Sequence, residues 1–284
     1  MEGVGLHSGE PASVTLHPAP ADTGVVFISG DAAIKASSEN VTDTSYATSL
    51  EKNGVRVRTV EHLLAALAGL SIDNVFIEVE GPEVPILDGS SAGFIAALKE
   101  AGVEVLPAPR KYLKVLKAVT VHDGDKSASL LPATTGRLTY RIDFDHPLLV
   151  DQSLSMEIRP DVFEHELSAA RTFGFLREVE YLRKAGLARG GSLDNAVVMD
   201  DERILNEDGL RYPDEFVRHK MLDAIGDVSL LGMPFIGHLV ADKSGHKLNH
   251  RLVCELLSHP DAWMIVEGEP AREEVPMPLA EALK

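Results

Sequence analysis

The stretch RHKMLDAIGD, residues 218–227, places a histidine and two carboxylates at four-residue intervals in a helix-forming run. Residues four apart lie one above the other on the same face of an α-helix. His219 and Asp223 can therefore reach one divalent ion, and Asp227 follows one turn later. Because acids on an otherwise apolar face are costly to bury unless they are paired or bind a cation, the stretch predicts a metal site. The alternative is a solvated face with aspartate–arginine or aspartate–lysine pairs.

A second helix repeats part of this pattern and connects it to the fold. His62 lies seven residues before Gly69 in one predicted helix. His219 lies seven residues before Gly226 in the other, and an apolar strand follows each helix. The match suggests an internal duplication, although short helix patterns also resemble one another by chance. A duplication would place two equivalent helices at a domain interface, where both histidines could meet one ion.

Length and charge limit the classes of protein that the chain can represent. Its 284 residues exceed what one hydrophobic core usually organises, so two domains are expected, with one large α/β domain as the alternative. Lysine and arginine number 27 against 44 acidic residues, a net charge of −17 that opposes binding to nucleic acid or an anionic membrane. Cys254 has no second cysteine to pair with, and no apolar run approaches the roughly 20 residues of a spanning helix. We expect a cytoplasmic protein without a nucleic-acid partner or stable membrane insertion.

The pattern of apolar residues predicts an α+β protein. Strands are expected within residues 12–28, 75–80, 112–122, 126–132, 137–144, 196–199 and 235–241. Helices are expected at about 60–69, with Thr59 as N-cap, and at 92–101, 177–184, 214–231 and 247–257. The proline-containing segment 107–110 is typical of a linker. We therefore expect an N-terminal α+β domain over 1–107, a C-terminal α+β domain over 111–267 and a mobile tail over 268–284.

The dipeptide Glu61-His62 suggests how such a metal would be used. In zinc hydrolases a histidine binds the metal while a glutamate reaches the metal-bound water. The pair lacks the HExxH spacing, and an acid at a helix N-terminus beside a partly buried histidine is the simpler alternative. Combined with the second helix, His62, His219 and Asp223 make a ligand set of two nitrogens and one oxygen that leaves a position for water. Non-haem iron uses the same ligands, so spacing does not fix the metal.

Two further segments carry polar groups that chemistry could use. His246 lies in a glycine-containing turn before a helix, and Asp227 could hold it protonated as a general acid. A structural or exposed histidine is the alternative. Residues 170–175, ARTFGF, offer an arginine and a hydroxyl to an oxygen, or else form a turn with two core phenylalanines. No GxxxxGK[ST], GxGxxG, GxSxG or HExxH motif occurs, which removes several common enzyme classes.

Taken in order, these motifs resemble the UDP-3-O-acyl-N-acetylglucosamine deacetylases, zinc amidases that commit bacteria to lipid A synthesis. The likeness runs from Gly3 to about Trp263. Its segments are GVGLHSG at 3–9, TVEHL at 59–63, DGS at 88–90, RTFGF at 171–175, LNEDGL at 205–210, HKMLDAIGD at 219–227 and SGHKLN at 244–249. The resemblance implies two similar α+β domains, each a layered sheet with packed helices, with the active site at their interface.

By position, the resemblance also implies a role for each candidate residue. The ligands of Zn²⁺ would be His62, His219 and Asp223. Glu61 would be the general base, and His246 the general acid oriented by Asp227. Together these groups would hydrolyse the N-acetyl group of the substrate to give acetate and a free amine.

The substrate implied by the resemblance is a UDP-linked acylated amino sugar. Thr172 would polarise the carbonyl, and Lys220 would contact the nucleotide sugar or the oxyanion. The unit after Thr172 would form the passage for the 3-O-acyl chain, with Phe173, Leu182, Leu187, Ala196 and Val198. One internal active site makes a monomer sufficient. The alternatives are a non-catalytic nucleotide-sugar binding protein and another metal-dependent amidohydrolase on the same scaffold.

Overall fold

The computed structural model describes residues 1–268 as a mixed α+β fold with two main sheets. The expected α+β class is therefore confirmed. Of the tail expected at 268–284, the part from residue 269 onward lies outside the described residues. Within residues 1–268, none of the helices combines the length and apolar character that crossing a membrane requires.

The first sheet has the strand order β1-β2-β8-β3-β4. Its strands are β1 (Glu2–Val4), β2 (Pro11–Pro18), β3 (Val25–Ser29), β4 (Ala32–Lys35) and β8 (Val75–Glu80). Neighbours run antiparallel, except that β3 and β8 run parallel. The single strand region expected over 12–28 contains two strands instead, because Asp22 and Gly24 both take left-handed φ angles, 63° and 73°, and turn the chain.

The second sheet has the strand order β10-β11-β16-β12-β13. These strands are β10 (Val119–Asp123), β11 (Lys126–Leu131), β12 (Gly136–Ile142), β13 (Gln152–Glu157) and β16 (Phe235–Asp242). Among these five strands only β12 and β16 run parallel. The sheet is extended by β9 (Lys111–Val115), which pairs in parallel with β16 and antiparallel with β17 (Trp263–Glu267). The strand expected over 112–122 is thus divided into β9 and β10.

The two sheets share one topology. In each, two hairpins form first, a helix follows, and the next strand enters between the hairpins, parallel to the third strand. The helix before that strand is α1 (Glu61–Gly69) in the first half and α5 (Glu215–Val228) in the second. A further helix follows it, α2 (Ala92–Ala101) or α6 (His246–Ser258). The duplication suggested by the histidine spacing therefore has a counterpart in the order and direction of the strands.

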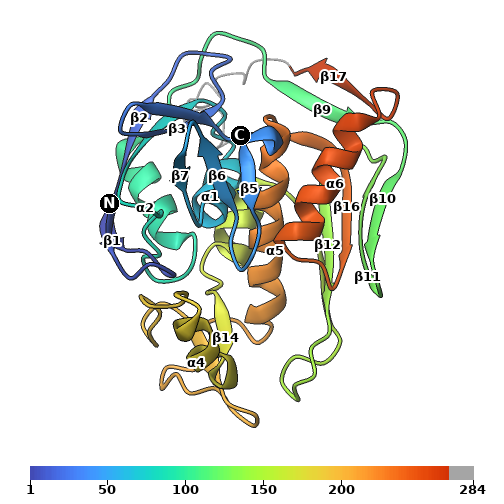
Figure 1. Ribbon diagram of the computed structural model, residues 1–284. Coiled ribbons are helices and arrows are strands. Elements are labelled where there is room, and N and C mark those ends of the chain that lie inside the picture. The colour runs from blue at the N-terminus through green and yellow to red at the C-terminus, as the bar shows by residue number, and fades with distance from the viewer. Residues whose placement is uncertain (269–284) are drawn as a thin grey trace, which may run out of the picture.

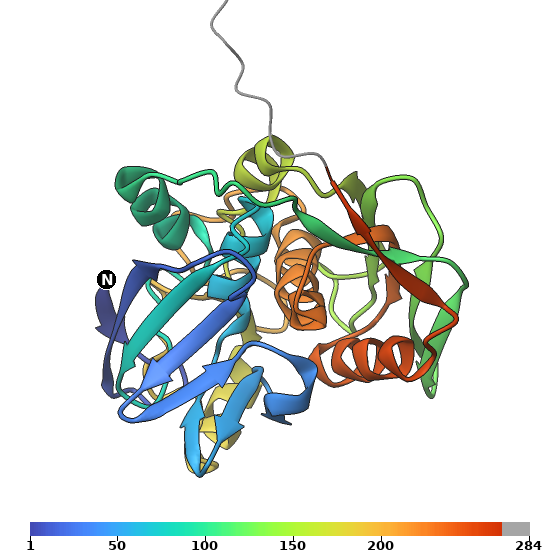
Figure 2. The same ribbon diagram turned by 90° about the horizontal axis from the view of Figure 1, so that it is seen from above.

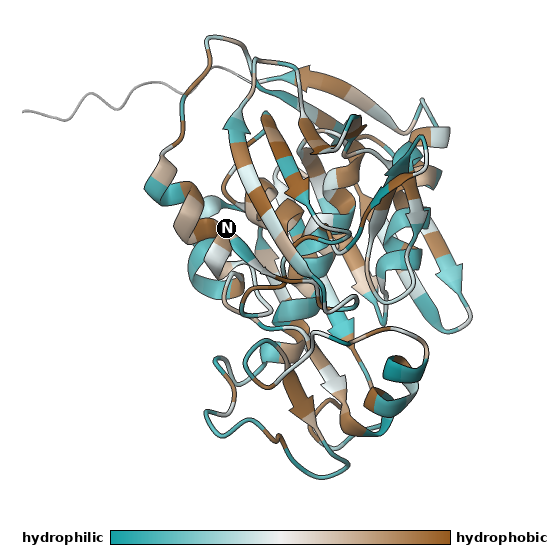
Figure 3. Ribbon diagram, turned by 60° about the vertical axis from the view of Figure 1, so that its left-hand side comes forward, coloured by the Kyte–Doolittle hydropathy of each residue, from teal (hydrophilic) through white to brown (hydrophobic). Residues whose placement is uncertain are grey.

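Each half carries an insertion between its fourth strand and its core helix. The first insertion contains the short helix η1 (Ser38–Asn40) and a sheet of β5 (Val41–Asp43), β6 (Ser49–Lys52) and β7 (Val55–Val57). The second contains α3 (Pro160–Val162), η2 (Phe163–Leu167), β14 (Phe173–Phe175), α4 (Leu176–Lys184) and β15 (Val197–Met199). Strands β14 and β15 pair in parallel around α4, and this unit projects below the main sheets in Figure 1. Figure 3 shows apolar residues concentrated on its strands.

Helices α1 and α5 pack against each other between the two sheets (Figure 2). Their contact is unusually close at Gly226, because a Cβ atom there would lie 2.1 Å from the backbone oxygen of Glu61. Helix α5 ends at Val228 and continues as the short 3₁₀ helix η3 (Ser229–Leu231), so the predicted end at 231 includes this extra turn. The close contact brings the start of α1 beside the middle of α5.

Thr59 does not cap α1, so that prediction is wrong. The N-cap position is Val60, which makes no side-chain capping bond. Thr59 instead takes a φ angle of 56°, and its hydroxyl donates to Glu83 Oε1 at 2.6 Å. Glu83 is completely buried, so leaving its carboxylate without hydrogen-bond donors would cost more free energy than leaving the helix end without a side-chain cap.

Candidate metal and acid–base site

Three buried side chains from α1 and α5 converge. The Oδ1 atom of Asp223 lies 3.4 Å from His62 Nε2 and 3.2 Å from His219 Nε2. One candidate ligand atom from each residue lies within 4.8 Å of the others. The two imidazole rings are nearly perpendicular, at 83°, with centroids 5.0 Å apart. Four-residue spacing on α5 and the close packing of α1 together create this cluster.

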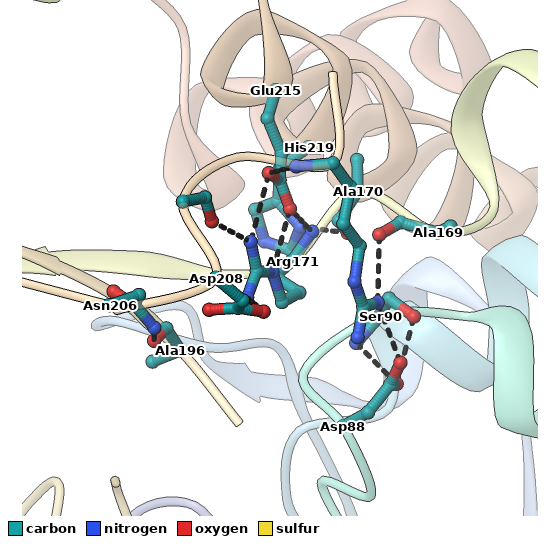
Figure 4. Close-up of polar contacts among 12 residues, drawn as sticks. Asp88, Ser90, Ala169, Ala170, Arg171, Ala196, Asn206, Asp208, Glu215 and His219 are labelled. Carbon is teal, nitrogen blue, oxygen red and sulfur yellow. Dashed lines mark hydrogen bonds and ion pairs between the residues drawn. The ribbon is translucent and has the colours of Figure 1, made fainter. Parts of the chain in front are cut away.

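The side chains in this cluster fit a divalent cation. Asp223 Oδ1 is buried and has no hydrogen-bond partner among residues 1–268, which is costly for a carboxylate oxygen. His219 Nδ1 bonds to the Ala170 carbonyl at 3.0 Å, so that nitrogen carries the proton and Nε2 offers its lone pair (Figure 4). Burial lowers the pKa of His219 to about 4, which keeps the ring neutral near pH 7, as metal binding requires.

Lys220 contacts the same aspartate from the other side. Its Nζ donates to Asp223 Oδ2 at 2.7 Å, which leaves Oδ1 facing the histidines. Although burial disfavours the carboxylate, His219 and Lys220 hold the pKa of Asp223 well below its usual range. The structure thus places Lys220 in the cluster through Asp223, and a contact to the nucleotide sugar stays a prediction.

Glu61 lies at the first position of α1, next to the cluster, and is 3% exposed. Its Oε2 accepts a hydrogen bond from the Thr48 backbone N–H at 3.0 Å. Burial raises the pKa of Glu61, and the nearby His246 and His62 only partly oppose that effect. A buried carboxylate with a raised pKa, beside a candidate metal site, has the properties of a general base.

His246 faces Glu61 from the start of α6. Its Nδ1 lies 2.9 Å from Asp227 Oδ2, and its Nε2 lies 3.9 Å from Glu61 Oε1. Burial alone would lower the pKa of His246, but the adjacent Asp227 carboxylate outweighs burial and raises it to about 9. His246 is therefore protonated near pH 7, with its second N–H directed toward the side of the site that holds Glu61.

Two residues that the sequence did not reveal hold Asp227 in place. The Thr48 hydroxyl donates to Oδ1 at 2.6 Å, and the Asn249 amide donates to Oδ2 at 2.9 Å. Thr48 therefore fixes Asp227 with its hydroxyl while its backbone N–H binds Glu61. Asn249 follows His246 by three residues on α6, a spacing that could have suggested a shared helix face. No local pattern distinguishes Thr48, because its role depends on the insertion meeting α5.

Arg171 serves the structure instead of offering its guanidinium to a ligand. It is 2% exposed, and its Nε donates to Glu215 Oε1 at 2.9 Å, as Figure 4 shows. Its other nitrogens bind Asp208 at 3.2 Å and the Gly209 carbonyl at 2.7 Å. The arginine thereby ties α5 to the segment whose Ala170 carbonyl orients His219, and the expectation that it binds a substrate oxygen is not supported.

Thr172 and Phe173 follow Arg171 at the edge of the cluster. The Thr172 N–H donates to the Gly89 carbonyl at 2.8 Å, while no hydrogen bond to another residue in the described chain engages its hydroxyl. The Phe173 ring lies 6.2 Å from the His219 ring and 5.1 Å from the Phe216 ring. Both residues are half-buried, so they are placed to meet a ligand beside the cluster.

The residues expected in the acyl passage lie on the second insertion. Asn206 holds this segment, because its amide donates to the Ala196 carbonyl and accepts from the Val198 N–H, both at 2.9 Å (Figure 4). Helix α4 contains no buried residue, although it is amphipathic. The side chains in question are half-buried at Leu182, Leu187, Ala196 and Val198. A passage for an acyl chain remains a prediction.

The fold and the cluster together define a metalloenzyme class in which a candidate base and a protonated histidine flank a site of two histidines and one aspartate. A family model supports a narrower assignment. The model for UDP-3-O-acyl N-acetylglycosamine deacetylase (LpxC) matches residues 1–258. The chain therefore belongs to this family.

Curated relatives agree with the family model. A protein of Myxococcus xanthus (strain DK1622) is 56% identical over 276 residues, which cover 96% of this chain and 87% of the relative. A protein of Anaeromyxobacter dehalogenans (strain 2CP-C) is 53% identical, and the match covers 93% of this chain and 86% of the relative. One of Pseudomonas entomophila (strain L48) is 50% identical, with coverage of 95% and 91%. All three are named UDP-3-O-acyl-N-acetylglucosamine deacetylase.

Proposed function

We propose that the protein hydrolyses the N-acetyl group of a UDP-3-O-acyl-N-acetylglucosamine, the committed step of lipid A synthesis, and releases acetate and a free amine. Family membership supports the substrate and the reaction. The observation that carries the proposal is an Asp223 oxygen that has no hydrogen-bond partner within residues 1–268 and lies between two histidine nitrogens, beside Glu61 and protonated His246.

We assign Zn²⁺ as the metal, held by His62 Nε2, His219 Nε2 and Asp223 Oδ1. Because Lys220 occupies the second oxygen of Asp223, the three residues offer three ligand atoms and leave a position for water. When bound, zinc supplies Lewis-acid chemistry that acidifies water and polarises a carbonyl. Iron(II) accepts the same ligand types, so metal analysis of the purified protein must accompany the assay.

Glu61 acts as the general base in this proposal. Burial raises its pKa, and the Thr48 N–H fixes one of its oxygens, so the other is free to take a proton from the attacking water. The raised pKa of Glu61 lies closer to neutral pH than the pKa of an exposed glutamate, so Glu61 is the stronger base. Attack of the deprotonated water on the acetyl carbon then forms the new C–O bond.

His246 acts as the general acid. Asp227 keeps the ring protonated and directs Nδ1 toward itself, so Nε2–H is the group that delivers a proton to the departing amine nitrogen. Breaking the C–N bond leaves acetate and the glucosamine amine. The Thr172 hydroxyl donates to the developing oxyanion, and the Lys220 ammonium adds positive charge beside it.

The remaining substrate contacts belong to the second insertion. We assign Phe173, Ala196 and Val198 to the acyl chain, supported by their half-buried apolar side chains and by the position of the Phe173 ring, 6.2 Å from that of His219. Lys220 would also contact the nucleotide-sugar portion. The two halves, 1–107 and 111–267, would be the domains, with the site at their interface. One chain supplies every proposed group, so a monomer is sufficient. We place this monomer in the cytoplasm.

An assay of acetate release from a UDP-3-O-acyl-N-acetylglucosamine tests the proposal. The purified full chain should release acetate, lose activity with a chelator and regain it with Zn²⁺. Release from other N-acetyl sugars at equal rates would favour another amidohydrolase. Substrate binding without release would favour the non-catalytic alternative, and either result would overturn the proposed function.

A further inference from the structure

The turn between β16 and α6 holds a polar side chain that the proposed mechanism does not use. Strand β16 leads through residues 243–245 into α6, which packs beside α5 (Figure 1). Ser244 lies in this turn, two residues before His246, and is 9% exposed. Its hydroxyl donates to Asn249 Oδ1 at 2.6 Å, the one hydrogen bond that it makes within residues 1–268. The serine hydroxyl therefore binds the same amide that binds Asp227.

The second sheet fixes the backbone of this turn. The Tyr140 hydroxyl donates to the Ser244 carbonyl at 2.7 Å, and the Lys243 N–H donates to the Arg141 carbonyl at 2.8 Å. Tyr140 is completely buried on β12, the strand that pairs in parallel with β16. Lys243 takes a left-handed φ angle of 53°, which turns the chain out of the strand. The Ser244 hydroxyl is thus presented to α6 from a backbone that the sheet holds in place.

The direction of the Asn249 amide decides what Asp227 meets. An asparagine side chain offers an acceptor oxygen on one side and a donor nitrogen on the other. Its Nδ2 donates to Asp227 Oδ2 at 2.9 Å, while its Oδ1 accepts from Ser244. The reversed amide would place its oxygen against the Asp227 carboxylate, where two acceptors repel, and would give up the hydrogen bond that Ser244 donates. Asn249 is 1% exposed, so both partners matter to its orientation.

Asp227 accepts hydrogen bonds from three different elements. The Thr48 hydroxyl binds Oδ1 at 2.6 Å, the Asn249 amide binds Oδ2, and His246 Nδ1 lies 2.9 Å from Oδ2 and 3.1 Å from Oδ1. His246 and Asn249 therefore share one oxygen. A donor on that oxygen fixes the plane of the carboxylate, and this plane sets the direction of the imidazole ring. Rotation of the carboxylate would turn the ring and move its Nε2, which now lies 3.9 Å from Glu61 Oε1.

We propose that Ser244 is a positioning residue for the general acid, which it orients through the Asn249 amide and the Asp227 carboxylate. The inference rests on the proposed function, because it takes His246 as the group that protonates the departing amine. Within residues 1–268, no hydrogen bond joins the Ser244 hydroxyl to Glu61 or to a metal ligand. Loss of this hydroxyl should therefore slow proton transfer and leave metal and substrate binding intact.

Steady-state kinetics of zinc-loaded Ser244→Ala test this role. With the UDP-3-O-acyl-N-acetylglucosamine as substrate, kcat should fall by about three- to tenfold, the effect of roughly one hydrogen bond, while KM and zinc content stay unchanged. Ser244→Cys should lose less, because a thiol is a weaker donor. Ser258→Ala is the control on the same helix, since its hydroxyl donates to the Glu255 carbonyl at 2.8 Å, and it should keep the wild-type kcat.

Double variants show whether Ser244 acts through the acid. If it does, Ser244→Ala should cause no further loss of kcat in an Asn249→Ala protein or in a His246→Gln protein, measured by single-turnover release of acetate. A role in stability alone would lower kcat by the same factor in the wild type and in both backgrounds. Equal factors in the three proteins would overturn the proposal.

The proton signal of the His246 Nδ1–H gives a readout without turnover. In the zinc-loaded wild type, this hydrogen-bonded proton should give a downfield NMR signal, assigned by its loss in His246→Gln. Ser244→Ala and Asn249→Ala should broaden the signal through faster exchange with water, and Ser258→Ala should not. The comparison stays informative if the proposed substrate is not hydrolysed, so the two failures are distinguishable. An unchanged signal in Ser244→Ala and Ser244→Cys would overturn the role of the serine.

Discussion

Gly226 of α5 lies against the backbone carbonyl of Glu61 in α1, so close that a Cβ atom would reach 2.1 Å from that oxygen. A backbone oxygen at the start of a packed helix cannot move aside as a flexible side chain can. Gly226→Ala should therefore separate the two helices, destabilise the protein by about 1–3 kcal/mol and weaken metal binding. Urea unfolding and the zinc content of the purified variant measure the two effects. Gly174→Ala is the stability control, because no atom of the described residues lies within 4 Å of a Cβ built there.

Glu61→Gln separates catalysis from metal binding. The amide keeps the shape of the side chain but cannot take a proton, so turnover should fall by about 10²- to 10⁴-fold. Zinc content should stay near that of the wild type, because Glu61 is outside the ligand set. A variant that turns over at nearly the wild-type rate would exclude Glu61 as the base.

His219→Ala should have the opposite signature. Loss of one of the three ligands should abolish stable zinc binding together with activity. Metal analysis after gel filtration measures the first loss directly. His238→Ala is a suitable control, since His238 lies on β16 and bonds to Thr139 at 2.8 Å, away from the cluster. Full zinc content in His219→Ala would remove His219 from the site.

The His246–Asp227 pair predicts a defined pH dependence. The pKa of His246 is raised to about 9, so the acid form should persist through neutral pH and kcat/KM should fall as pH rises through about 9. Because the folded-state value lies above the ordinary value of 6.5, the pair stabilises the fold fully below pH 6.5 and progressively less up to pH 9. In Asp227→Asn burial dominates, so the alkaline limb should move to lower pH. An unshifted limb in that variant would contradict the pairing.

Arg171→Met tests the buried ion pair behind the cluster. Removing the guanidinium leaves Glu215 completely buried without its charge partner, so the variant should lose about 3–5 kcal/mol in the free energy of unfolding. Arg56→Gln breaks an exposed pair and should cost less than about 1 kcal/mol. Comparable losses in the two variants, measured by denaturant unfolding, would show that Arg171 is not the structural tie inferred from its contacts.

The sequence predicted most reliably what depends on local periodicity. Helix α2 has the predicted bounds of 92–101, and the four-residue spacing of His219 and Asp223 correctly placed them on one helix face. The repeat of His62 and His219 also pointed to the paired helices. The contact between these helices could be predicted because a repeat implies two equivalent helices in equivalent places of the fold, and not only two helices of one type.

Features that depend on distant partners escaped the sequence. Thr59 has a side chain suited to an N-cap, but its hydroxyl donates instead to buried Glu83, 24 residues away in the sequence. Thr48 binds Asp227 across 179 residues, and no local pattern could pair them. Arg171 looked available to a ligand until the position of Glu215 was known. In each case a buried charge, satisfied through tertiary contacts, overrode the preference of the local segment.

The repeated topology makes the two core helices equivalent, yet their side chains have diverged. Alignment of His62 with His219 sets Ala66 against Asp223 and Glu61 against Arg218. A symmetric pair of first halves would hold two glutamates but no aspartate ligand, and a symmetric pair of second halves would hold the ligands without that base. Two identical copies of either half would therefore carry matched but incomplete chemistry. The ligand set and the base require different residues at the facing positions of the two helices, so the site depends on broken symmetry.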